Sequence, residues 1–70
     1  MKKFYVSTDI NGRKTSYWIV NENNVRRIWI DSDGFPIGGW FTSSFTPEKV
    51  WYMERTEEIS KYEAAFLFDI

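Results

Sequence analysis

Hydrophobic and polar residues alternate in short runs along the first thirty positions of the chain. The runs that include residues 4–6, 17–20 and 28–30 are rich in aromatic and β-branched residues, and polar turn residues separate them. This pattern is typical of antiparallel strands joined by tight turns.

The first turn is predicted at Asn11-Gly12, because both central residues of a type I′ turn need a positive φ and this pair favours it. Counting outward from a two-residue loop fixes which residues face each other across the hairpin. The predicted pairs are Phe4 with Ile19, Tyr5 with Trp18, and Val6 with Tyr17.

The second turn is predicted within residues 21–24. A turn at Asn23-Asn24 places Trp18 opposite Trp29, whereas a turn at Glu22-Asn23 is expected to disrupt this register and the two faces that follow from it. With the first of these turns, one face of the sheet carries Phe4, Val6, Tyr17, Ile19, Ile28 and Ile30, and the other carries Tyr5, Trp18, Val20 and Trp29.

The third turn is predicted at residues 31–34, where Asp31 and Asp33 precede Gly34. Residues 35–39 contain too much Gly and Pro for a central strand, so we expect a short edge strand at residues 40–42.

Residues 43–55 allow two interpretations. Thr46 followed by Pro47 has the form of a helix N-cap and first helical position. Residues 50–55 are rich in aromatics and lack a helical stripe, so the favoured prediction is a loop followed by a strand.

The C-terminal segment favours a helix over residues 57–67, because it is rich in good helix formers and Ser60 and Glu63 have the spacing of a capping box. Thr56 is the alternative cap. A period-two alternation from Tyr62 to Ile70 supports a strand instead.

These elements predict one α+β domain over residues 1–70. It is a small antiparallel β-meander of three to five strands with a C-terminal helix packed on one face. An all-β small barrel is the alternative.

The chain contains no Cys and no His, which excludes disulfides, thiolate nucleophiles, imidazole bases and structural zinc sites. Asp31 and Asp33 form a compact acidic pair, but an Asp-rich turn explains them without a metal. We therefore expect a protein that is not an enzyme and has no metal or cofactor.

Net charge is −1, with six basic and two acidic residues in positions 1–30 and three basic and eight acidic residues in positions 31–70. No apolar run is long enough to span a bilayer or to form a signal peptide. The sequence thus predicts a cytoplasmic protein with no membrane partner.

Fourteen of the seventy residues are Trp, Tyr or Phe, whereas a chain of this size buries only about 60% of its unfolded surface. Because one short helix covers only one face of a sheet, some rings are expected to stay exposed. The predicted binding surface is the row Tyr5, Trp18 and Trp29, with Arg27, Lys14 and Lys3 nearby. A core role for this row, with no ligand, is the alternative.

The composition of this row favours binding of another protein, since Tyr, Trp and Arg dominate interface hot spots. Small size without catalytic residues is also similar in style to phage or mobile-element inhibitors and adaptors. The alternatives are single-stranded nucleic-acid binding by the same aromatic and basic row, and homo-oligomerisation through it. The sequence does not identify the partner.

Overall fold

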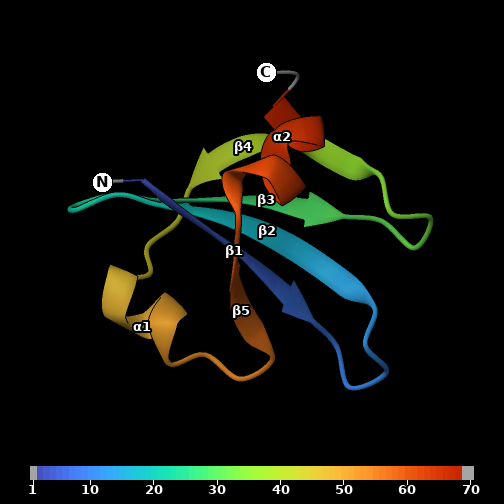
Figure 1. The fold of residues 1–70 in the computed structure, drawn as a ribbon, viewed down its shortest axis with the longest axis horizontal. Helices are drawn as coiled ribbons and strands as arrows, with labels where there is room; N and C mark the ends of the chain where they lie inside the picture. The colour runs from blue at the N-terminus through green and yellow to red at the C-terminus, as the bar shows by residue number, and fades with distance from the viewer. Residues whose placement is uncertain (1, 69–70) are drawn as a thin grey trace.

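The computed structural model describes residues 2–68 and has the predicted α+β fold, an open five-stranded antiparallel sheet with short helices (Figure 1). Four strands form a meander and the fifth returns beside the first, so the strand order is β4-β3-β2-β1-β5. Because β4 and β5 are the two edges, the sheet does not close into the alternative barrel. The strands are β1 (Lys3–Thr8), β2 (Lys14–Val20), β3 (Val25–Ile30), β4 (Pro36–Thr42) and β5 (Thr56–Ile59), and the helices are α1 (Pro47–Trp51) and α2 (Lys61–Phe68).

The first hairpin has the predicted register, with Tyr5 opposite Trp18, but it has a different turn. The N–H of Asp9 donates to the carbonyl of Arg13, and the loop between them has a positive φ only at Gly12. The predicted type I′ turn is therefore wrong. A β-bulge near the end of β1 compensates for the longer loop and restores the register.

The same loop design joins β3 to β4. The Oδ1 atom of Asp31 accepts hydrogen bonds from the backbone N–H groups of Asp33 and Phe35, and Gly34 has a φ of 89°. In the first loop, the Oδ1 atom of Asp9 accepts the two corresponding backbone hydrogen bonds. The turn predicted at Asp31–Gly34 is confirmed.

The second hairpin differs from its predicted register by two residues. The Asn21 N–H donates to the Asn24 carbonyl, so the loop is Glu22-Asn23 and Trp18 lies opposite Arg27. This register buries Val25, which the predicted one leaves opposite Glu22. The alternative turn is therefore the one observed, but the expectation that it disrupts the two faces is wrong, because an even shift leaves every side chain on its own face.

The edge position of β4 is confirmed, although the strand begins at Pro36 rather than Trp40. A bulge interrupts its pairing with β3, and Gly38 within it has a φ of 68°. Glycine and proline are thus confined to an edge, where they remove few ladder hydrogen bonds.

The favoured prediction of a loop and strand after residue 43 is wrong, because residues 47–51 form α1. The Thr46 hydroxyl caps this helix by accepting from the Lys49 N–H, and Pro47 occupies the first turn. A helix of five residues buries only Val50, so its sequence shows no repeated pattern of hydrophobic positions at helical spacing.

The predicted helix 57–67 is partly correct. Ser60 caps α2 by accepting from the Glu63 N–H, but residues 56–59 form strand β5 on the free edge of β1. Tertiary pairing here overrides the helix propensity of Glu57 and Glu58. Helix α2 excludes the alternative strand through residue 68, and Ile70 lies outside the described residues.

Two hydrophobic clusters occupy the two faces of the sheet. Helix α1 packs on one face through Val50, which closes a cluster with Tyr5, Trp18, Val20 and Val25. The other face carries Val6, Tyr17, Ile28 and Ile30, with Trp40 and Ile59 against them. Helix α2 contacts β1 and buries Ala64.

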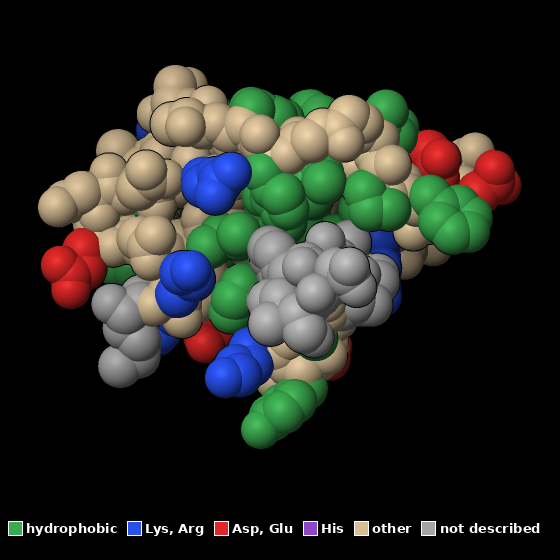
Figure 2. Space-filling view, turned by 90° about the horizontal axis from the view of Figure 1, so that it is seen from above, with side chains coloured by type: hydrophobic (Ala, Val, Ile, Leu, Met, Phe, Trp, Pro, Cys, Tyr) green, Lys and Arg blue, Asp and Glu red, His purple; other side chains and the backbone are tan. Residues whose placement is uncertain are grey.

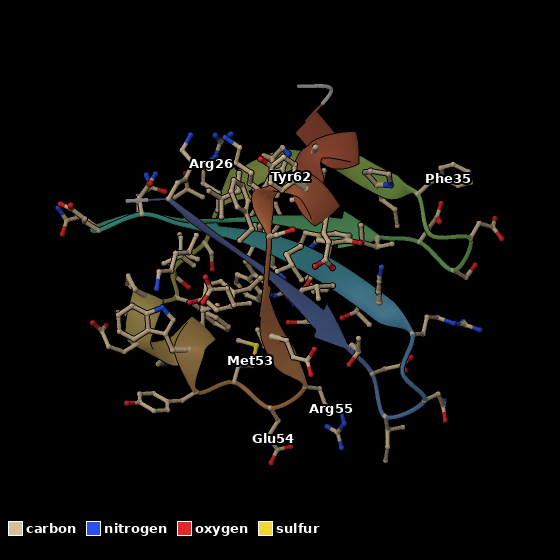
Figure 3. All side chains as sticks on the ribbon, viewed as in Figure 1. Arg26, Phe35, Met53, Glu54, Arg55 and Tyr62 are labelled. Atoms are coloured by element: carbon tan, nitrogen blue, oxygen red, sulfur yellow. The ribbon has the colours of Figure 1, made fainter. Side chains whose placement is uncertain are left out.

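Arg55, in the loop from α1 to β5, is the non-glycine residue with a positive φ, 55°, among residues 2–68 (Figure 3). We expect Arg55→Gly to stabilise the fold by about 1 kcal/mol, because glycine adopts this conformation without steric cost. Urea unfolding measures the change. Arg55→Ala is the control, since it also removes the exposed ion pair with Glu54 but keeps the strain. Equal stability of the two variants would contradict the prediction.

Candidate functional site

The predicted aromatic row does not form a single exposed surface. Tyr5 is 7% exposed and Trp18 is 0% exposed, whereas Trp29 is 45% exposed. The prediction that Tyr5 and Trp18 face a partner is therefore wrong. Helix α1 and its flanking loops cover both rings, and the two-residue register shift moves Trp29 beyond that cover.

Trp18 is fixed in the core by contacts on several sides. Its indole N–H donates to the Ser7 hydroxyl at 2.8 Å, and the Phe45 ring stacks on it at a centroid distance of 5.5 Å. The Ser7 hydroxyl also lies 2.6 Å from that of Thr56, which ties β1 to β5. These contacts identify Trp18 as the structural centre of its face.

Tyr5 lies in the same cluster. Burial, reinforced by the negative charge of Glu58, raises the pKa of the Tyr5 phenol, and a hydrogen bond with the Trp51 side chain partly opposes this. The phenol is therefore neutral at physiological pH and acts as a core group.

An exposed patch remains on this face at the β3–β4 edge. Trp29 lies opposite Ile37 and Arg27 lies opposite Phe41, and facing residues share one side of a sheet. Ile37 is 52% exposed and Phe41 is 41% exposed. We call these four residues, Arg27, Trp29, Ile37 and Phe41, the Trp29 patch. Figure 2 is seen from above Figure 1, from the side of α2, so it shows the opposite face of the sheet, where hydrophobic side chains lie beside Lys and Arg side chains.

Arg27 connects this patch to the core. Its guanidinium carbon lies 4.3 Å from the Trp18 ring centroid and 3.7 Å from that of Trp29. Stacking on two indole rings holds the guanidinium plane in place. Burial lowers the pKa of Arg27, which still carries its charge at neutral pH.

Two polar atoms beside this stack have no hydrogen-bond partner within the described structure. They are the Nε atom of Arg27 and the Oγ atom of Ser16, which lies on β2 opposite Trp29. Buried polar atoms are usually paired, so these two are exceptions, and their burial places them out of reach of a partner at the surface.

The two predicted lysines do not join the Trp29 patch. Lys14 lies with its ammonium 5.9 Å from the Tyr17 ring, which belongs to the other face. Lys3 lines a cleft of about 570 Å³ between the starts of β1 and α2, with Phe4, Ile59, Lys61 and Tyr62. Of the predicted binding residues, Trp29 and Arg27 alone come together at an exposed site.

Sequence reasoning missed Ile37 and Phe41 as members of the surface. Phe41 lies in the predicted edge strand 40–42, which is a signal for it, whereas Ile37 lies in residues 35–39, where no strand is predicted. Phe35, at the β3–β4 hairpin, and Tyr62, on α2, are also exposed but lie apart from each other (Figure 3).

Two buried serines provide a matched test of this geometry. We expect Ser7→Ala to destabilise the fold by about 1–3 kcal/mol, because it leaves the Trp18 N–H buried without an acceptor. Ser16→Ala removes a hydroxyl with no partner among residues 2–68 and is expected to be neutral or slightly stabilising. Chemical denaturation of both variants measures the difference, and an equal loss would contradict the assigned hydrogen bonds.

Neither helix within residues 2–68 has the length and apolar character needed to cross a membrane. The same residues contain no group of three or more Asp or Glu side chains placed to hold a metal ion.

No protein-family model, curated protein or solved structure matches this chain.

Proposed function

We propose that the chain is a small non-catalytic protein-binding module and that the Trp29 patch is its binding surface. The observation that carries the proposal is the exposed indole of Trp29 stacked on a fixed Arg27 guanidinium. Trp and Arg are the residues most enriched at interface hot spots, and side chains already held in place lose little entropy on binding.

The neighbouring residues support this function. Ile37 and Phe41 extend the apolar area around Trp29, and contiguous exposed apolar surface is uncommon on monomers unless it binds something. The partner is to be sought first in the cytoplasm, because the chain needs no oxidising compartment. An inhibitor or adaptor role within that class stays a prediction.

Single-stranded nucleic-acid binding has weaker support. Such a surface combines stacked rings with cations that follow the phosphate backbone, but Lys3 and Lys14 lie away from Trp29. Anisotropy titration of a fluorescein-labelled oligothymidine across a salt series tests it. Tight, salt-sensitive binding that both Trp29→Ala and Lys14→Ala weaken would favour nucleic acid over protein.

Affinity capture from the source-cell lysate tests the proposed function. The bait is the native chain beside two double variants, Trp29→Ala with Phe41→Ala and, as matched control, Tyr52→Ala with Tyr62→Ala. Tyr52 and Tyr62 are 85% and 83% exposed and lie outside the patch. We expect a partner that the patch variant loses and the control retains. Identical captured proteins for all three baits would contradict the proposal.

A further inference from the structure

We infer that the Trp29 patch recognises an acidic, extended peptide segment of its partner protein, with a carboxylate on Arg27 and an apolar side chain on Trp29. This inference rests on the proposed function and adds the chemistry of the partner. Its starting point is that Arg27 is the charged member of an otherwise apolar patch.

The charge of Arg27 is not neutralised within the described structure. No carboxylate of residues 2–68 forms an ion pair with it, and its Nε atom has no acceptor. The guanidinium lies over both indole rings, and its Nε atom is buried, so the terminal Nη groups are the donors that Arg27 offers to a partner. A planar guanidinium with unused donors matches a carboxylate, which accepts two parallel hydrogen bonds.

A basic partner segment fits the patch less well. The face of Trp29 is attractive to a cation, but Arg27 already lies 3.7 Å from that ring centroid. A second cation on Trp29 is therefore brought close to the first, and like charges brought together at an interface oppose binding. Charge complementarity selects an acidic segment.

The spacing of the patch also specifies the segment. Arg27 and Trp29 are two residues apart on one strand, which is about 6.8 Å, and Phe41 and Ile37 lie about 4.8 Å away on the next strand. Residues i and i+2 of an extended peptide have the same separation and point to the same side. We therefore expect the pattern acidic residue, any residue, apolar residue, in either chain direction.

Selection from a phage-displayed random dodecapeptide library on the full chain tests the inference. We expect enrichment of peptides with Asp or Glu two positions from an aromatic or aliphatic residue. A synthetic peptide of the consensus sequence is expected to bind at least tenfold more weakly to Arg27→Gln than to the native chain. The same peptide with its acidic residue changed to the corresponding amide is expected to bind both proteins with that reduced affinity. Because this change is in the peptide, it cannot affect folding of the chain.

The outcomes distinguish failure of the proposed function from failure of the inferred partner chemistry. If selected peptides bind Trp29→Ala as well as the native chain, the proposed function of the patch fails. If binding needs Trp29 but the peptides are neutral or basic, or the acid-to-amide change has no effect, only the inferred chemistry fails. Sedimentation showing a native dimer that Trp29→Ala converts to monomer would assign the patch to a second copy and overturn the inferred partner.

Discussion

Trp18→Ala is expected to remove a large part of the folding free energy of this chain. Trp18 is fully buried, and truncating a buried Trp to Ala costs about 3–5 kcal/mol. A seventy-residue domain has a total stability of about 4–10 kcal/mol. Circular dichroism during urea unfolding is expected to show a variant that is largely unfolded or has a greatly lowered midpoint.

Trp29→Ala is the matched comparison, because it makes the same chemical change on the same face of the sheet. We expect it to cost under about 1 kcal/mol, since Trp29 is half exposed and its loss leaves no buried cavity. The buried hydrogen bond from Trp18 to Ser7 adds to the difference. Similar costs for the two variants would contradict the division of this face into a covered core and an open patch.

The second large effect is the loss of partner affinity in Trp29→Ala. A central interface Trp typically contributes 2 kcal/mol or more when truncated, which is a loss of about thirtyfold or more. The variant loses the exposed ring and also one of the two rings that hold the Arg27 guanidinium. Calorimetric titration against the captured partner measures the change.

Trp29→Phe should recover part of this loss, because a smaller ring still stacks on Arg27. Tyr52→Ala is the control for removing an exposed ring elsewhere and should leave affinity unchanged. An equal loss of affinity in Trp29→Ala and Tyr52→Ala would show that binding does not depend on the patch.

The first three strands and their two faces could be predicted from the sequence, because period-two alternation survives small errors. Strand β5 and the burial of Tyr5 and Trp18 were not predicted. The first register was correct even though the turn was not, since a bulge offset the longer loop between Asp9 and Arg13. The second register was wrong by two residues, yet Trp18 and Trp29 stayed on the same face.

The candidate site was only partly predictable, because it depends on what covers each ring. Alternation assigns Tyr5, Trp18 and Trp29 to one face but does not show which of them a helix covers. Which rings are covered depends on α1, whose single turn leaves almost no periodic signal in the sequence. It also depends on where the β2–β3 loop lies, which is at Glu22-Asn23. Composition did predict correctly that large rings would remain exposed.

Proton exchange of the indole N–H groups, followed by ¹⁵N nuclear magnetic resonance on the free chain, tests the central claim most directly. The Trp18 N–H is buried and donates to Ser7, so its exchange is expected to be slow and to approach the rate of global unfolding. The Trp29 N–H, on a half-exposed ring, is expected to exchange rapidly. Rapid exchange at Trp18, or strong protection at Trp29 in the monomer, would contradict the account.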